Sequence, residues 1–365
     1  MTLREIARQR LISQQLTTSS LTKPEPVVRW FAAVQAQEYA LSKWAIGLRL
    51  PDSVDADVEN AIDAGRILRT HLLRPTWHFI AADDIHWLRA LSAPRVHAVN
   101  AFMYRKSGLD AKLFKRTHQI LIKSLEGGKQ LTRDELNAQF RKRNILAVGP
   151  RLGYIMMHAE LEGIITSGAR RGNQFTYALL EERAPVTKMK TREEALAELT
   201  ARYFRSRGPA TINDFSTWSG LTVADCKKGV QLLGKQLSSA HVGQNTFYYD
   251  PQVASGDRTK ALSLLPVYDE YIMGYKDRTA ILQTRNLKNP AAALTFDSTI
   301  IYDGQIVGTW RRIPGKKMID LGYAFFGTPS ASQERAFANA VRRYAGFTAC
   351  DIVLHNKSSK NTSGE

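Results

Sequence analysis

The sequence has few cysteines, no long apolar run and fewer acidic than basic residues. Its two cysteines, Cys226 and Cys350, show no metal-ligating spacing, so we expect a reducing compartment and neither a disulfide framework nor a zinc site. No stretch approaches the ~18 apolar residues of a membrane span. Residues 1–10 carry charges where a signal peptide needs an apolar core. These absences predict a soluble cytoplasmic protein without a metal ion or an organic cofactor.

The composition that remains is globular and basic. Lys and Arg number 51 against 34 Asp and Glu, which gives a net charge of +17 and a sequence pI near 9.9. Because 44% of the residues are hydrophobic, disorder cannot dominate. The basic residues are spread over the whole chain, which favours a folded protein that binds nucleic acid. A basic protein without a polyanionic partner is the plainer alternative.

The length of 365 residues suggests two to four modules of roughly 100 to 150 residues each. Residues 1–108 are predicted to form the first module. Its helices are expected over residues 3–16, 26–35, 41–50 and 55–64. The polar residues Arg74, Thr76 and His78 then alternate with apolar neighbours, which is the period of a strand with one polar face. Helices followed by a short hairpin are typical of a winged helix.

Residues 109–185 repeat this plan. Thr132 and Glu135 have the spacing of a capping box, and a hairpin follows further along the chain. Arg170 and Arg171 lie at its tip, where a wing contacts phosphate. From this segment alone, a solvated loop with two arginines is an equally good interpretation.

Residues 186–255 are predicted to form a third winged helix. Two successive helices are separated at Gly220, which is the spacing of a helix-turn-helix. The second of them carries Lys227 and Lys228, which are candidate DNA contacts. Many helical hairpins share this spacing, so the pattern alone is only moderately specific.

Residues 256–352 are predicted to form a small antiparallel β module that ends in a helix over 332–345. Asp303-Gly304 indicates a two-residue hairpin loop, because both positions tolerate positive φ. Four basic residues on the following hairpin are candidate DNA contacts or solvated charges: Arg311, Arg312, Lys316 and Lys317. Residues 353–365 are predicted to be a disordered tail. The expected class is α+β, with three tandem winged-helix modules before the β module and the C-terminal helix.

Gln35 and Gln37 follow an amphipathic helical pattern. On an unbroken helix their side chains would point about 200° apart, so they can converge only if the helix ends between them. Two amides aimed at one point could hold a water molecule. An ordinary solvated helix end is the alternative that these residues alone favour.

In order and spacing, these motifs resemble the tandem winged-helix DNA glycosylases of the AlkZ/YcaQ type, a helix-turn-helix family. The resemblance covers residues 1 to about 350. Its motifs are Gln35-Ala36-Gln37, Arg74-Pro75-Thr76-Trp77-His78, Tyr268-Asp269-Glu270-Tyr271 with Gly274-Tyr275-Lys276-Asp277-Arg278, and Asp303-Gly304 leading to Gly308-Thr309-Trp310-Arg311. One branch of the family has Asp at the second catalytic position. This chain has Gln there, and so resembles the branch of antibiotic self-resistance enzymes.

The resemblance implies a monofunctional DNA glycosylase that excises cationic alkylated purines from duplex DNA, including one arm of an interstrand crosslink. It implies Gln35 and Gln37 as the catalytic pair, with Arg74, Thr76 and His78 as supporting residues. Neutral amides cannot take a proton at pH 7, so they would orient water and place partial negative charge near an oxocarbenium-like sugar. Several DNA-binding modules in series make a monomer sufficient, associated with the nucleoid and without an obligate protein partner.

A winged-helix transcription regulator or architectural DNA binder fits the composition and the coarse architecture equally well. Only the glutamine pair and the polar strand of the first wing favour an enzyme. A catalytically silent relative that still recognises alkylated DNA also fits. The sequence leaves the preferred adduct open.

Overall fold

The computed structural model describes residues 1–184, 186, 189–253, 260–282, 297–315 and 318–356. Lys316 and Lys317 therefore lie outside the described residues. The described residues combine helices with four separate sheets, and the predicted α+β class is confirmed. Within the described part of the chain, no helix is both long and apolar enough to cross a membrane.

The N-terminal part of the chain is mostly helical and carries the first wing, the hairpin of β2 and β3. Its elements are α1 (Leu3–Ser13), α2 (Pro24–Phe31), β1 (Val34–Gln35), α3 (Tyr39–Gly47), α4 (Asp55–Asp63), β2 (Ile67–Leu72), β3 (Thr76–Ala81) and α5 (Ile85–Lys106). The sheet order is β1-β3-β2. The short strand β1 pairs antiparallel with β3, so Gln35 lies opposite His78.

The next part of the chain has its own core and carries the second wing, the hairpin of β5 and β6. Its elements are α6 (Ala111–Leu125), β4 (Leu131–Thr132), α7 (Arg133–Arg141), α8 (Pro150–Leu161), β5 (Ile165–Ser167), β6 (Thr176–Leu179) and α9 (Leu180–Arg183). The predicted capping box opens α7, where Thr132 and Glu135 bond each other's backbone N–H groups. Its hydrophobic core comes almost entirely from residues 104–179.

A third set of helices and a third wing follow. The elements are α10 (Arg192–Arg207), α11 (Ile212–Ser219), α12 (Val223–Leu233), β7 (Ser238–Val242) and β8 (Asn245–Tyr249). Gly220 ends α11 in the left-handed region at φ 72°, a conformation that glycine adopts without strain. This part shares one core with α5 and the first wing.

The last part is a five-stranded sheet covered by one long helix. Its elements are β9 (Leu262–Leu265), α13 (Glu270–Met273), β10 (Ser298–Tyr302), β11 (Gln305–Pro314), β12 (Met318–Phe325), α15 (Ala331–Thr348) and β13 (Asp351–Asn356). Asp303 and Gly304 both have positive φ between β10 and β11, so the predicted hairpin loop is confirmed. The sheet order is β13-β12-β11-β10-β9.

Two features of this sheet correct the sequence prediction. Residues 351–356 form strand β13, so the predicted disordered tail of residues 353–365 is wrong for residues 353–356, and residues 357–365 lie outside the described part of the chain. β13 also pairs in parallel with β12, which makes the sheet mixed rather than antiparallel. The pairing adds backbone hydrogen bonds between the strands. The polar sequence of this segment does not predict them.

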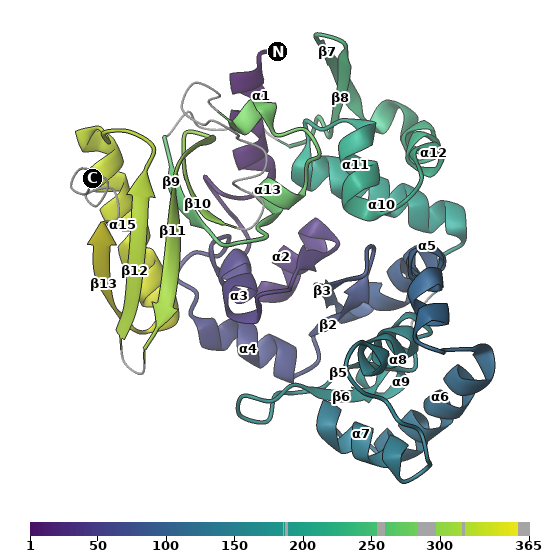
Figure 1. Cartoon of the computed structure of the whole chain (residues 1–365). Coiled ribbons are helices and arrows are strands. Elements are labelled where there is room, and N and C mark those ends of the chain that lie inside the picture. The colour runs from purple at the N-terminus through teal and green to yellow at the C-terminus, as the bar shows by residue number, and fades with distance from the viewer. Residues whose placement is uncertain (185, 187–188, 254–259, 283–296, 316–317, 357–365) are drawn as a thin grey trace, which may run out of the picture.

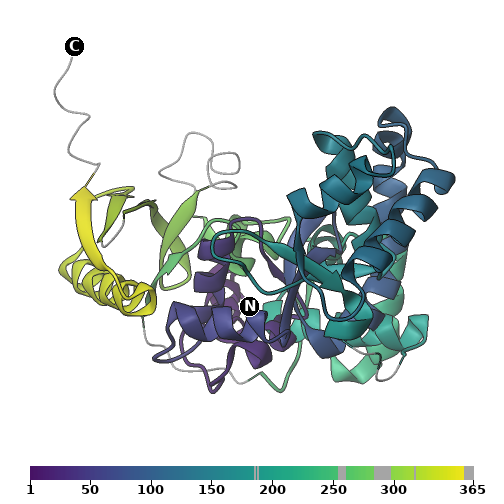
Figure 2. The same ribbon diagram turned by 90° about the horizontal axis from the view of Figure 1, so that it is seen from below.

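The N-terminal helices lie between the two ends of the molecule. Figure 2 shows the C-terminal sheet with α15 at one end and the part of the chain around α6 and α7 at the other. One hydrophobic core joins α1 to α4 with the C-terminal sheet and α15. At its edge, Arg4 and Arg8 of α1 bind the Asp303 carboxylate at 3.0 and 2.8 Å. The N-terminal helices therefore depend on residues nearly 300 positions away.

Candidate active site

The two glutamines follow a helix that ends earlier than predicted. Helix α2 stops at Phe31, and Ala32 takes a positive φ of 63°. The prediction that the helix runs to about residue 35 and ends between the glutamines is wrong. The chain instead continues as β1, and the Ala36 N–H donates to the Trp77 carbonyl at 2.7 Å. We call residues 32–37 the glutamine corner.

Gln35 is held on both its backbone and its side chain. Its Oε1 accepts a hydrogen bond from Arg74 Nη2 at 3.0 Å, and its backbone N–H donates to Glu270 Oε1 at 2.9 Å. Because an arginine can only donate, its contact fixes which end of the amide carries the oxygen. Only 4% of Gln35 is exposed, so this amide lies at the floor of the corner.

Gln37 lies at the surface of the same corner. Its residue is exposed, and its Oε1 accepts a hydrogen bond from the backbone N–H of Trp77 at 2.8 Å. An amide oxygen has two lone pairs, so this bond leaves one acceptor position and both N–H donors of Gln37 for other partners. Both glutamines therefore contact the turn and the first residues of β3, one beneath and one outside.

His78 and Thr76 bring two further polar groups to the polar face of β3. His78 is fully buried, and its Nδ1 bonds the Thr76 carbonyl at 3.0 Å. A carbonyl only accepts, so Nδ1 carries the proton and Nε2 keeps a lone pair. Burial lowers the pKa of His78 well below its usual value, and the Arg74 guanidinium lowers it further. His78 is therefore neutral at pH 7.

His78 Nε2 and Thr76 Oγ1 are buried and have no hydrogen-bond partner among the described residues. Polar atoms that are buried in this way are usually bonded to water in folded proteins. They lie on the face of the sheet that carries Gln35, since residues 76 and 78 alternate with residue 77. The predicted set of Gln35, Gln37, Arg74, Thr76 and His78 is thus brought together in one place.

A buried ion pair that the sequence analysis did not identify supports the corner from behind. Arg207 Nη2 lies 2.6 Å from Glu270 Oε2, and both side chains are buried. The guanidinium also donates to the carbonyls of Phe31 at 3.0 Å and Ala33 at 3.1 Å, on either side of Ala32. Trp218 Nε1 donates to Glu270 Oε2 at 2.9 Å. This cluster holds the positive-φ turn that aims β1 at the first wing.

A second buried ion pair anchors Glu270 in turn. Arg49 makes two hydrogen bonds of 2.9 Å to the carboxylate of Asp269. Gln14 bridges the two clusters, because its Oε1 accepts from Arg49 and its Nε2 donates to the Glu270 carbonyl. Two adjacent acidic residues in a mostly apolar segment were the available sequence signal, but their basic partners are more than 60 positions away.

A pocket of about 390 Å³ lies beside the first wing. Trp77, Tyr154 and Tyr177 line it together with Met157, so its walls are largely apolar and aromatic. Trp77 joins the pocket to the corner, because its backbone N–H is the donor to Gln37. The pocket itself lies on the face of β3 that carries the Trp77 side chain, opposite the face of Gln35 and His78.

The predicted DNA contacts on the second wing are bonded to the protein. Arg171 pairs with Glu135 at 2.8 Å. The Arg170 guanidinium lies over the rings of Tyr39 at 4.9 Å and Phe175 at 5.2 Å. The second Nη of Arg171 also donates to the Gln130 carbonyl at 2.7 Å. Their role as phosphate contacts stays a prediction.

The other predicted DNA contacts lie far from one another. Lys227 and Lys228 are exposed on α12, where Lys228 pairs with Glu193. Arg311 is exposed on β11, and Arg312 bonds the Tyr344 hydroxyl at 3.1 Å. Figure 1 shows α12 and β11 at opposite sides of the molecule. The structure therefore does not bring these two pairs together on one small surface.

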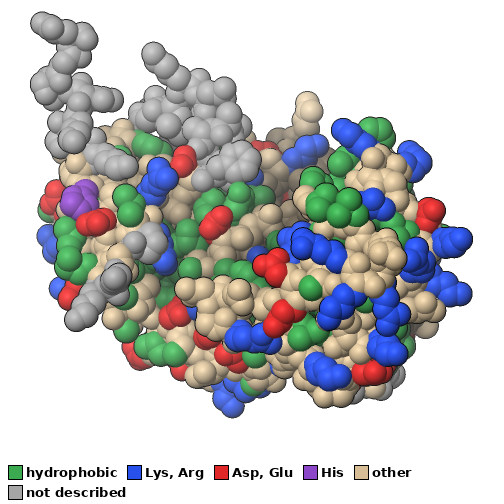
Figure 3. Space-filling model, turned by 60° about the horizontal axis from the view of Figure 1, so that its bottom comes forward, with side chains coloured by type: hydrophobic (Ala, Val, Ile, Leu, Met, Phe, Trp, Pro, Cys, Tyr) green, Lys and Arg blue, Asp and Glu red, His purple; other side chains and the backbone are tan. Residues whose placement is uncertain are grey.

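A dense basic surface, not among the predicted DNA contacts, lies on the helices α6 and α7. Residues 105–151 contain twelve Lys and Arg against four Asp and Glu, a net +8 within 47 residues. Four of these residues, Arg116, Lys123, Lys129 and Arg143, line a groove of about 530 Å³. We call these four residues the basic face. Figure 3 shows Lys and Arg side chains gathered over this end of the molecule. A count of charge along the sequence would have found this surface.

Comparison with known proteins agrees with these observations. Residues 28–347 match the family described as DNA glycosylase AlkZ-like. The solved structure of the Streptomyces sahachiroi DNA glycosylase AlkZ is similar at a TM-score of 0.79 and 21% sequence identity. The match covers 98% of this chain and 99% of that one. No curated protein sequence matches this chain.

Proposed function

The chain belongs to the AlkZ-like DNA glycosylase family, and from that premise we propose that it hydrolyses the N-glycosidic bond of cationic alkylated purines in duplex DNA. The observation that carries the proposal is the polar cluster at the glutamine corner. Gln35 lies opposite His78 across the β1–β3 pairing, Gln37 bonds the Trp77 backbone next to it, and the buried Nε2 of His78 has no partner among the described residues. Each of these groups can bond water and none brings a formal positive charge.

The reaction needs little or no general-acid catalysis. A purine alkylated at N7 or N3 carries a positive charge, so it leaves as a neutral base without being protonated first. The demanding species is the sugar, which becomes oxocarbenium-like while water approaches C1′. Amide oxygens stabilise such a centre through their partial negative charge and orient the water by hydrogen bonds. We assign this role to Gln37 at the surface and to Gln35 behind it.

The supporting residues act on these amides rather than on the substrate. Arg74 donates to Gln35 Oε1 and also to the carbonyl of Trp218, which ties the amide to the third helical set. Neutral His78 and Thr76 offer bonding positions for a water molecule on the same face. None of these side chains is a primary amine that could attack the sugar. Water is therefore the proposed nucleophile, as in a monofunctional glycosylase.

The surroundings suit a DNA substrate with a bulky adduct. Phosphate contacts supply most of the affinity for duplex DNA, and the basic face offers four cationic side chains for them. Gln37 is exposed at the outer side of the corner, which leaves room for a bulky adduct at the surface.

The test is to incubate the protein with duplex DNA that contains 7-methylguanine, and to measure free base and abasic sites. We expect release of base by the wild type, and at least a hundredfold loss in Gln37→Ala, the size expected for removing one preorganised polar group. Because Gln37 is exposed, its variant should unfold at the wild-type temperature. Gln35→Ala should lose activity as well.

Gln231→Ala is the matched control, since this exposed glutamine lies on α12, far from the corner in Figure 1. It should release base at the wild-type rate. Wild-type protein that binds the duplex tightly without releasing base would favour a non-catalytic DNA-binding protein instead. A duplex crosslinked through guanine N7 positions, assayed in parallel, tests whether the substrate class extends to crosslinks.

A further inference from the structure

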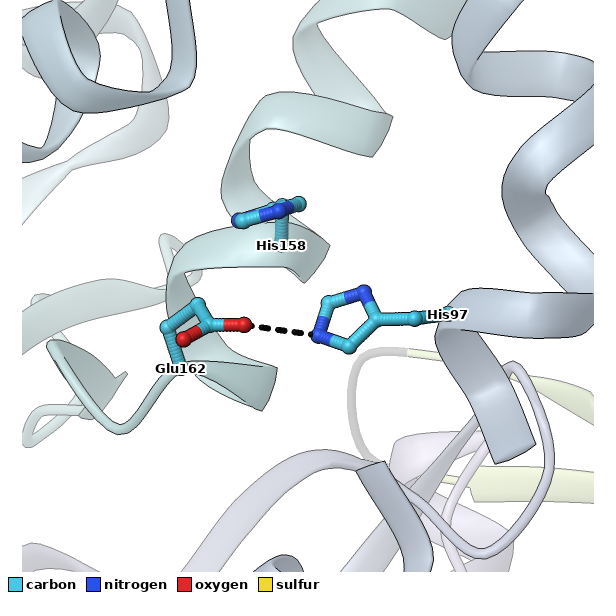
Figure 4. Close-up of side chains that lie close together, drawn as sticks. All are labelled: His97, His158 and Glu162. Atoms are coloured by element: carbon cyan, nitrogen blue, oxygen red, sulfur yellow. Dashed lines mark ion pairs between the residues drawn. The ribbon is translucent and has the colours of Figure 1, made fainter. Parts of the chain in front are cut away.

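We propose that His97, His158 and Glu162 form a site for a Zn²⁺ ion that ties helix α5 to helix α8. One nitrogen of each histidine and one carboxylate oxygen of Glu162 all lie within 4.8 Å of one another. Figure 4 shows the three side chains converging from the two helices. The site is separate from the glutamine corner and does not depend on the glycosylase reaction.

The spacing of the residues suits a shared ion. His158 and Glu162 are four positions apart at the end of α8, so their side chains lie on one face of the helix. His97 projects from α5, and its Nε2 lies 3.0 Å from Glu162 Oε1. Tetrahedral zinc with bonds of 2.0 to 2.1 Å places its ligand atoms about 3.3 Å apart. Side-chain shifts of about 1 Å would complete that geometry.

Both histidines are in the protonation state that a metal requires. Burial lowers the pKa of His97. Burial, together with the nearby His97 and His118, lowers the pKa of His158 to about 3. Neutral imidazole offers a lone pair, whereas imidazolium offers none. The side chain of Glu162 is 46% exposed, which leaves a path for the ion to enter.

The ring nitrogens that face away from the site have partners of their own. His97 Nδ1 lies 3.0 Å from the Tyr104 hydroxyl, and His158 Nδ1 lies 3.2 Å from His118 Nε2. Histidines that bind metals nearly always have their second nitrogen hydrogen-bonded, because that contact fixes the ring and its tautomer. Two imidazoles and one carboxylate favour zinc over calcium or magnesium. A water molecule can take the fourth position.

Cysteine spacing in the sequence predicted no zinc site. The three ligands come instead from histidine and glutamate, on two helices that are packed together only in the fold. An ion at this point would link α5, which continues from the first wing, to the core of the part that carries the basic face. We expect the ion to fix the orientation of the basic face relative to the glutamine corner.

The experiment uses the full chain after removal of metal with a chelator, titrated with Zn²⁺ alone against a chromophoric competitor. We expect one equivalent of Zn²⁺ per chain and a rise in melting temperature, since an ion that binds only the folded state stabilises it. His158→Gln and Glu162→Gln should each weaken binding at least about tenfold, the lower end of what even outer partners of a metal site cost. His118→Gln should weaken it less.

His241→Gln is the matched control, because this histidine is exposed on the third wing and should leave affinity unchanged. Glu162→Gln guards against misfolding, since its side chain is half exposed and its chelated form should melt like the chelated wild type. Equal zinc affinity in His158→Gln, Glu162→Gln and His241→Gln would overturn the proposal and indicate adventitious binding. So would the absence of a stoichiometric site in the wild type.

Discussion

The glutamine corner and the basic face are built in opposite ways. Behind the corner, Arg207 and Glu270 are fully buried. Arg207 donates to the carbonyls on both sides of Ala32, and Glu270 accepts from the Gln35 backbone N–H. The basic face presents exposed side chains with few fixed partners. Chemistry at one atom needs groups held within fractions of an ångström, whereas attraction to a phosphate backbone needs charge but little geometry. The two regions therefore should respond differently to mutation.

The largest expected effect comes from breaking the buried pair behind the corner. Glu270→Ala leaves the Arg207 guanidinium buried without its carboxylate, so we expect a loss of about 3 to 5 kcal/mol in the free energy of unfolding. It also frees the Gln35 backbone N–H, and base release should fall with it. Urea unfolding at pH 7.5 measures the change.

Glu193→Ala is the matched comparison, because Glu193 pairs with Lys228 at the surface. Exposed ion pairs contribute little to stability, so this variant should unfold like the wild type. A Glu270→Ala protein as stable as Glu193→Ala would show that the corner does not depend on its buried pair.

A second, smaller effect is expected from the basic face. Replacing Arg116, Lys123 and Lys129 by Gln should make the slope of log affinity against log salt shallower by about 2.7, at roughly 0.9 per phosphate contact. Damaged and undamaged duplexes should be affected alike, because phosphate contacts carry no base information. Base release at saturating DNA should not change.

Lys227→Gln with Lys228→Gln provides the contrast on α12. We expect this pair to change the salt slope less than the basic face does, since α12 and α6 lie apart in Figure 1. Fluorescence anisotropy at several salt concentrations measures both variants. If the α12 pair shifts the slope more, the duplex lies along the third helical set instead.

The smallest effect is a pH dependence that comes from His78. Its pKa is lowered in the folded state, whereas in the unfolded chain it is near 6.5. The stability that it contributes is therefore complete above about pH 6.5, and is lost as the pH falls toward the folded value. At pH 5.5 the loss is about 1.4 kcal/mol for one such histidine.

His78→Asn should flatten the fall in unfolding free energy between pH 7.5 and 5.5 by about 1 kcal/mol. His97, His118 and His158 are partly buried with lowered pKa values and will keep a remaining slope in the same direction. Urea unfolding of both proteins at the two pH values measures the difference. An unchanged slope would mean that His78 is protonated in the folded state.

Local signals in the sequence predicted much of the architecture. Capping boxes, Gly220 and the Asp303-Gly304 turn marked element boundaries because their conformations are decided within a few residues. The alternation over residues 74–79 likewise predicted β3. The resemblance to a known family then singled out Gln35 and Gln37, which residue patterns alone could not separate from a solvated helix end.

The features that were missed depend on partners distant in the chain. The apolar spacing through Phe31 and Val34 continues a helix, yet the chain leaves it at Ala32, where Arg207 binds the flanking carbonyls. Strand β13 exists because β12 lies beside it. Neither contact produces a periodic pattern of residues in its own segment, so the sequence pattern alone could not predict it.

The distribution of hydrophobic cores has a consequence for how this chain could be altered. One core runs from α1 to α15, whereas residues 104–179 bury their apolar side chains chiefly among themselves. A shortened protein that lacked the final sheet and helix would expose the apolar side chains beneath β1 to water. We expect the backbone there to lose its folded conformation. Helices α6 and α7, in contrast, pack within their own core, so their surface charges can be redesigned without disturbing the packing beneath β1.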